Sequence, residues 1–74
     1  MANNVGWVVE IAAPSLDGAP TREYYNVNIS DSSDSVDAVS KQFSARGDTV
    51  KAVRQLSAGE IAVLKLQLGA IEPA

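Results

Sequence analysis

The sequence predicts an α+β fold, a two-layer domain in which helices cover one face of a three-stranded, mainly antiparallel sheet. Two stretches before residue 31 are rich in β-branched and aromatic residues, as strands are. A later stretch spaces its apolar residues by three and four positions, which is typical of an amphipathic helix. The hydrophobic content of 46% over 74 residues is that of one folded domain, and we assign residues 1–74 to it.

The first strand is expected over residues 5–13, which end before Pro14. Because strand side chains alternate between the two faces, Val5, Trp7 and Val9 share one face. The opposite face is partly apolar as well. A strand that is apolar on both faces suits the middle of a sheet.

Residues 14–20 contain two prolines and an Asp-Gly pair, which predict a turn. A second strand follows over residues 21–30, with regular alternation of apolar and polar side chains. The side chains expected to face the core are Tyr25, Val27 and Ile29. Those expected to face solvent are Tyr24, Asn26 and Asn28.

The first helix has the clearest signals. Ser32 or Ser33 is expected to cap it, and Asp34 and Asp37 near its start suit the positive end of the helix dipole. Gly47 is the expected left-handed terminator. The apolar stripe of this helix consists of Val36, Val39 and Phe43.

Residues 48–56 predict a third strand with several aliphatic side chains. Ser57 and Glu60 then have the spacing of a capping box, so we expect a short second helix over residues 58–66. A competing pattern leaves an alternative open, because residues 64–68 alternate like a strand.

Gly69 should end this last element, and the tail over residues 70–74 is expected to be disordered. The chain order is therefore β-β-α-β-α. With the apolar first strand in the centre, the spatial order is 2-1-3, and the outer two strands are parallel to each other. The expected core consists of Trp7, Val9, Ile11, Tyr25, Val27, Ile29, Val36, Val39, Phe43, Val50, Ile61 and Leu64.

Missing residue types exclude several chemistries. The chain has no cysteine and no histidine, which removes thiol nucleophiles, thiolate or imidazole metal sites and serine–histidine–aspartate triads. We therefore predict no enzyme activity, no catalytic or metal-binding residue and no cofactor. No basic residue precedes the first apolar stretch and no apolar run could span a bilayer, so the expectation is a cytoplasmic protein without membrane contact.

The segment Asp31–Ser35 has a D-x-S-x-S pattern directly after a strand. It resembles the metal-coordinating loop of von Willebrand A-type adhesion domains, which implies oxygen ligands for a hard cation. That loop belongs to a much larger α/β domain, so we interpret the segment as a polar helix start. Asp31, Asp34 and Asp37 have the same explanation and do not predict a catalytic carboxylate cluster.

Two functional hypotheses remain. The first is a non-enzymatic protein–protein interaction module or small subunit, binding a protein partner or a second copy through the edge of the second strand at Tyr24, Asn26 and Asn28. The alternative is a regulator that contacts nucleic acid or an acidic partner. Its basic patch would consist of Lys41, Arg46, Lys51 and Arg54.

A net charge of −3 and a pI of about 4.6 argue against nucleic acid. An enzyme that uses only carboxylates, tyrosine or lysine ranks last. It would need a concave pocket that holds a desolvated Glu10 or Lys51.

Overall fold

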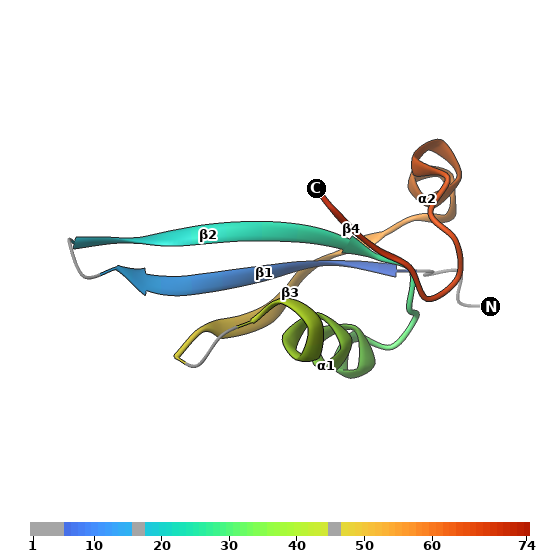
Figure 1. Ribbon diagram of the computed structural model, residues 1–74. Helices are drawn as coiled ribbons and strands as arrows, with labels where there is room; N and C mark the ends of the chain where they lie inside the picture. The colour runs from blue at the N-terminus through green and yellow to red at the C-terminus, as the bar shows by residue number, and fades with distance from the viewer. Residues whose placement is uncertain (1–5, 16–17, 45–46) are drawn as a thin grey trace.

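A four-stranded antiparallel sheet with two helices forms the structure (Figure 1). The computed structural model describes residues 6–15, 18–44 and 47–74. The strands are β1 (Gly6–Ser15), β2 (Gly18–Val27), β3 (Thr49–Leu56) and β4 (Ile71–Pro73), and the helices are α1 (Ser32–Phe43) and α2 (Ala58–Leu64). The order across the sheet is β3-β1-β2-β4, so the predicted class, the first five elements and the 2-1-3 arrangement are confirmed.

β1 and β2 form a longer hairpin than the sequence predicts (Figure 1). Their pairing runs from Trp7 opposite Val27 to Ser15 opposite Gly18, so the predicted turn over residues 14–20 is wrong. The register shifts between Ala13 and Ser15. Proline lacks a donor for the ladder but is tolerated at such an irregularity, which explains how strands continue through a Pro-rich segment.

The fourth strand corrects the expected three-stranded sheet and its disordered tail. β4 pairs with the end of β2, with Ile71 opposite Val27 and Pro73 opposite Tyr25. The turn before it is fixed by Asn28, whose N–H donates to the Ala70 carbonyl (3.0 Å). A strand of three residues that contains a proline has no alternation to detect, so the sequence pattern could not reveal it.

Helix α1 begins and ends at residues other than those predicted. Asp31 is the N-cap, because its carboxylate accepts a hydrogen bond from the Asp34 N–H (2.9 Å). Ser32 and Ser33 instead lie inside the first turn. The helix ends at Phe43 with Ser44 as an extended C-cap, before the expected Gly47 terminator.

Helix α2 confirms the capping box and decides between the two interpretations of residues 64–68. The Ser57 hydroxyl accepts from the Glu60 N–H (3.1 Å), and the Glu60 carboxylate accepts from the Ser57 N–H (3.0 Å). The helix ends at Leu64, and Lys65 adopts a left-handed conformation with a φ of 56°. The alternating residues therefore form a helix end and a turn, not a strand.

The two helices lie on opposite faces of the sheet, so the prediction that both cover one face is wrong (Figure 1). Helix α1 packs on the face that carries Val9 and Ile11. The segment around α2 packs on the Val8 face, at the end of the sheet, through Leu56 and Leu66. Val8 and Val9 are adjacent in a strand and point to opposite sides, which makes each face of β1 a separate core.

Most of the predicted core lies in the α1 layer. Its buried members are Val9, Ile11, Val27 and Val39. Its half-buried members are Trp7, Tyr25, Ile29, Val36 and Val50. Ile61 is half-buried in the second core, below α2.

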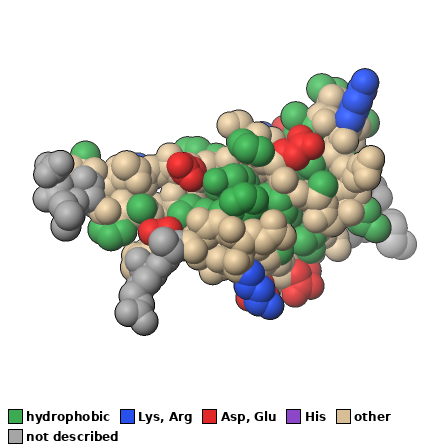
Figure 2. Space-filling view, in the orientation of Figure 1, with side chains coloured by type: hydrophobic (Ala, Val, Ile, Leu, Met, Phe, Trp, Pro, Cys, Tyr) green, Lys and Arg blue, Asp and Glu red, His purple; other side chains and the backbone are tan. Residues whose placement is uncertain are grey.

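Two core predictions are wrong. Phe43 and Leu64 are exposed, at 42% and 39%, and Phe43 stacks on the Tyr25 ring with centroids 4.6 Å apart. Figure 2 shows hydrophobic side chains gathered in the middle of the molecule, where α1 meets the sheet. Sequence reasoning also missed the buried members of the second core, which are Val8, Leu56 and Leu66.

Candidate functional site

The predicted binding edge of β2, at Tyr24, Asn26 and Asn28, is covered by the chain's own C-terminal segment. Asn26 lies opposite Glu72 of β4, and the Tyr24 carbonyl accepts from the Ala74 N–H (2.9 Å). Asn28 is 9% exposed, and its side-chain amide donates to the Leu66 carbonyl (2.8 Å). The expectation that Asn28 faces solvent is therefore wrong, because the turn before β4 covers it.

The remaining sheet edges in the described part of the chain carry features that discourage strand addition. The outer edge of β3 has a register shift opposite Val8 and Val9, and it presents Lys51 and Arg54. The free part of β2 contains Pro20, and β4 contains Pro73. Bulges, lysines and prolines are the usual protection of an edge strand. Strand addition at these edges is therefore disfavoured, which leaves the faces of the sheet as the surfaces to consider.

We call the side of the sheet opposite α1 the outer face. Residues directly opposite each other in antiparallel strands point to the same side. One row of this face therefore contains Arg54, Val8 and Asn26, and the next contains Lys51, Glu10 and Tyr24. Neighbouring rows lie about 7 Å apart, since a strand rises by about 3.4 Å per residue.

Glu10 is at the centre of the outer face and is only 8% exposed. The Tyr24 hydroxyl donates to Glu10 Oε2 (2.9 Å). Two cations flank the same carboxylate: Arg22 Nε lies 3.8 Å from Oε2 and Lys51 Nζ lies 3.7 Å from Oε1. The hydrogen bond to Glu10 raises the pKa of Tyr24, because it stabilises the neutral phenol.

A groove of about 680 Å³ opens beside α2 at one end of the outer face. We call it the α2 groove. Its lining residues are Asn26, Arg54, Leu56, Ser57, Gly59, Glu60, Val63, Leu64 and Ala74. Val63 is 82% exposed and Leu68, just beyond the helix, is 90% exposed, so aliphatic side chains are left in water at this end of the molecule. Concave sites with an apolar lining and a few polar groups are the usual form of a binding site.

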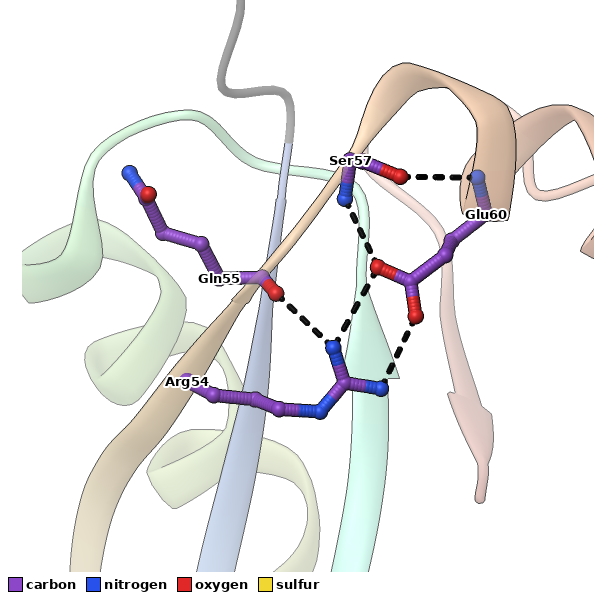
Figure 3. A network of polar contacts seen from close by, with 4 residues as sticks. All are labelled: Arg54, Gln55, Ser57 and Glu60. Carbon is purple, nitrogen blue, oxygen red and sulfur yellow. Dashed lines mark hydrogen bonds and ion pairs between the residues drawn. The ribbon is translucent and has the colours of Figure 1, made fainter.

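A polar network joins the end of β3 to the start of α2 beside the α2 groove (Figure 3). The Arg54 guanidinium donates to both Glu60 oxygens, at 2.9 Å and 3.2 Å, and to the Gln55 carbonyl at 3.0 Å. The hydrogen bonds from Arg54, followed by the one from the Ser57 N–H, lower the pKa of Glu60 from 4.5 to about 2. A bidentate pair of this kind fixes both side chains and so gives the groove wall a defined shape.

We expect this network to contribute stability that depends on pH. Since the folded-state pKa of Glu60 lies below its unfolded value, the contribution is present above pH 4.5 and is lost as the pH falls towards about 2. The urea midpoint of unfolding should therefore be higher for the wild type than for Glu60→Gln at neutral pH. The difference between the two midpoints should shrink as the pH falls through this range. Arg54→Gln, which removes the partner, should also reduce the pH dependence. A difference that stays constant down to pH 2 would contradict this account.

Of the predicted basic patch, the structure brings together only Lys51 and Arg54, in neighbouring rows of the outer face. Lys41 lies on α1 and pairs with Asp37 (3.0 Å), on the side of the sheet opposite the outer face. Lys51 and Arg54 are on β3 and face the carboxylates of Glu10 and Glu60. Arg46 lies outside the described residues. Each described member of the patch is thus within 4 Å of an acid, which leaves no continuous positive surface among them.

The acidic start of α1 behaves as a helix cap. Asp31 holds the first turn, and the Ser35 hydroxyl, which is fully buried, donates to the Ile29 carbonyl (3.0 Å). Within the described ranges, no group of three or more acidic side chains is arranged to hold a metal ion. The interpretation of Asp31–Ser35 as a polar helix start agrees with these hydrogen bonds.

The outer face and the α2 groove are therefore the candidate site. No protein-family model, curated protein or solved structure matches the chain. In the described part of the chain, neither helix is long and apolar enough to cross a membrane.

The sequence names Tyr24, Asn26, Lys51 and Arg54 as candidates, but it does not show that they lie together, because the parts of the site come from three strands and a helix. Glu10, Arg22 and Lys51 lie far apart in the chain, and only the strand register brings them together. One signal was present: Glu10 is the single charged residue in an otherwise apolar strand. A carboxylate in such a place requires cationic or hydrogen-bonding partners on the neighbouring strands.

Proposed function

We propose that this chain is a non-enzymatic interaction module that binds another protein through the outer face of its sheet and the α2 groove. The observation that carries the proposal is the exposure of aliphatic side chains beside a concave surface. Val63 lines the groove at 82% exposure, and Leu64 lines it at 39%. Apolar side chains gathered around a groove with a polar wall are characteristic of protein-binding sites.

The chemistry of the outer face supports binding rather than catalysis. Glu10 is the most desolvated of the acids on this face, and its two oxygens already face Tyr24, Arg22 and Lys51. It does not line the α2 groove. The nucleic-acid alternative is less favoured, because Lys41 and Arg54 each pair with an acid of their own and Lys51 shares Glu10 with Arg22, so the described members of the patch leave too little positive charge for a phosphate backbone.

A charge placed in the groove should weaken partner binding. Val63→Glu changes a side chain that is 82% exposed, so the fold should tolerate it. Ala62→Glu is the matched control, since it adds the same charge to an exposed position of α2 outside the groove lining. A partner captured from the source cell by the wild type, then purified, should bind Val63→Glu at least about tenfold more weakly by calorimetry. It should bind Ala62→Glu like the wild type.

Light scattering on the purified chain tests whether the partner is a second copy. A dimer that Val63→Glu converts to a monomer, while Ala62→Glu remains dimeric, would support the proposal with this chain as its own partner. A captured partner that binds all three proteins equally would overturn the proposal, because the α2 groove would then have no part in binding.

A further inference from the structure

We propose that the outer face recognises an extended segment of a partner protein that carries an aliphatic side chain and an acidic one two residues apart. The aliphatic side chain enters the α2 groove, and the carboxylate binds between Arg22 and Lys51. This inference rests on the proposed function and specifies the chemistry of the partner.

The charges on the outer face favour an incoming carboxylate. Arg22 and Lys51 are two cations against the single Glu10 carboxylate, and their contacts of 3.8 Å and 3.7 Å are too long for hydrogen bonds. Their side chains are 61% and 65% exposed. Arg54, by contrast, already donates to Glu60 and to the Gln55 carbonyl. Arg22 and Lys51 can therefore bind a carboxylate without losing a hydrogen bond to Glu10.

Glu10 fixes the position of this cationic pair. Its carboxylate is held by the Tyr24 hydroxyl and sits between the strands that carry the two cations, with Arg22 on β2 and Lys51 on β3. The local charge of Arg22, Lys51 and Glu10 together is one unit positive at neutral pH. An acidic group over this cluster is therefore attracted, whereas a basic group is repelled.

The row that contains Val8, Arg54 and Asn26 determines which level of the face accepts the aliphatic side chain. Arg54 in that row is neutralised by Glu60, and Glu72 of β4 lies opposite Asn26 and adds a negative charge. A carboxylate is thus disfavoured at the level of the groove, where the lining also contains Leu56 and Leu64. The groove level suits an aliphatic side chain, and the Glu10 level suits an acidic one.

The separation of the two levels sets the spacing in the partner. Asn26 and Arg54 line the groove and lie in the row of Val8, and the Glu10 row is two residues further along β1, which corresponds to about 7 Å. Side chains at positions i and i+2 of an extended peptide point to the same side at the same spacing. An aliphatic residue and a Glu or Asp separated by one residue, in either order, match both levels at once.

Amide NMR titrations with three capped synthetic peptides test the inference. The first is acetyl-Gly-Leu-Ser-Glu-Gly-amide, the second replaces its Glu by Gln, and the third replaces its Leu by Ala. We expect the first peptide to shift the amide signals of Arg22, Lys51 and Leu64. The other two should each bind about tenfold more weakly, because one lacks the charge-assisted hydrogen bonds and the other lacks the apolar anchor.

Two double variants that each remove two positive charges show which cations bind the peptide carboxylate. Arg22→Gln combined with Lys51→Gln should bind the Glu and Gln peptides equally. Lys41→Gln combined with Lys65→Gln removes the same charge outside the groove and the Glu10 cluster, and should keep the wild-type discrimination. The dispersion of the amide spectra confirms that each variant is folded.

Equal affinity of the wild type for the Glu and Gln peptides would overturn the inference, as would the absence of any shift. Binding that depends on Leu but not on Glu would overturn it while leaving the proposed function intact. The failure of the proposed function would instead appear as partner binding that Val63→Glu does not weaken.

Discussion

Gly6→Ala should destabilise the protein by about 2 kcal/mol or more. A Cβ atom at Gly6 would overlap with the backbone carbonyl oxygen of Val27 and would lie 3.1 Å from Ile61 Cδ1. The Val27 backbone cannot move without disturbing its pairing with Trp7 and Ile71. Glycine in a strand often marks such a close approach of two backbones. Urea unfolding with linear extrapolation measures the change.

Gly59→Ala is the matched control, because it makes the same chemical change in open space. The nearest atom to its added Cβ is the Ser57 hydroxyl oxygen at 3.8 Å, which is an ordinary contact. Gly59 lies inside α2, where alanine is favoured over glycine by about 1 kcal/mol. The two substitutions should therefore move stability in opposite directions. Equal effects would show that Gly6 is not confined by the β2 backbone.

Leu56→Ala should destabilise the protein by about 2–5 kcal/mol. Leu56 is 1% exposed and is one of three buried residues in the core below α2, with Val8 and Leu66. Removing most of its side chain leaves a cavity in a core too small to close around it. Thermal and urea unfolding, followed by circular dichroism, give the change in free energy.

Leu68→Ala is the control for this change. Leu68 is 90% exposed, so its truncation should alter stability by no more than about 0.5 kcal/mol. If Leu56→Ala were equally mild, α2 and the residues around it would contribute little to the folded state. The second core would then not hold this end of the sheet.

The elements that the sequence predicts are those whose signals are local. The alternation around Tyr25 and Val27 predicts β2, and Ser57 with Glu60 predicts the start of α2, because a cap depends on residues three positions apart. Pro14 was misleading, since it breaks most strands but lies here next to a register shift of the hairpin. The side of the sheet on which α2 packs is a tertiary property, decided by Val8 and Leu56.

The candidate site could not be predicted, because it depends on register. Shifting β2 by one residue against β1 would place Tyr24 on the other face and separate it from Glu10. The register shift in β3 has a similar effect: Ala52 lies opposite Val9 and Arg54 lies opposite Val8, with Val53 between them unpaired. Without that extra residue, Arg54 and Glu10 could not share a face. No local pattern in the sequence reveals a one-residue insertion in a strand.

The short strand β4 covers part of the edge of β2. β4 forms only three residue pairs with β2, yet these pairs cover the backbone of Tyr25, Asn26 and Val27. Loss of Ile71–Pro73 by truncation or proteolysis would uncover a strand edge that a second molecule could extend. We therefore expect a chain that lacks residues 71–73 to undergo strand exchange more readily than the intact chain.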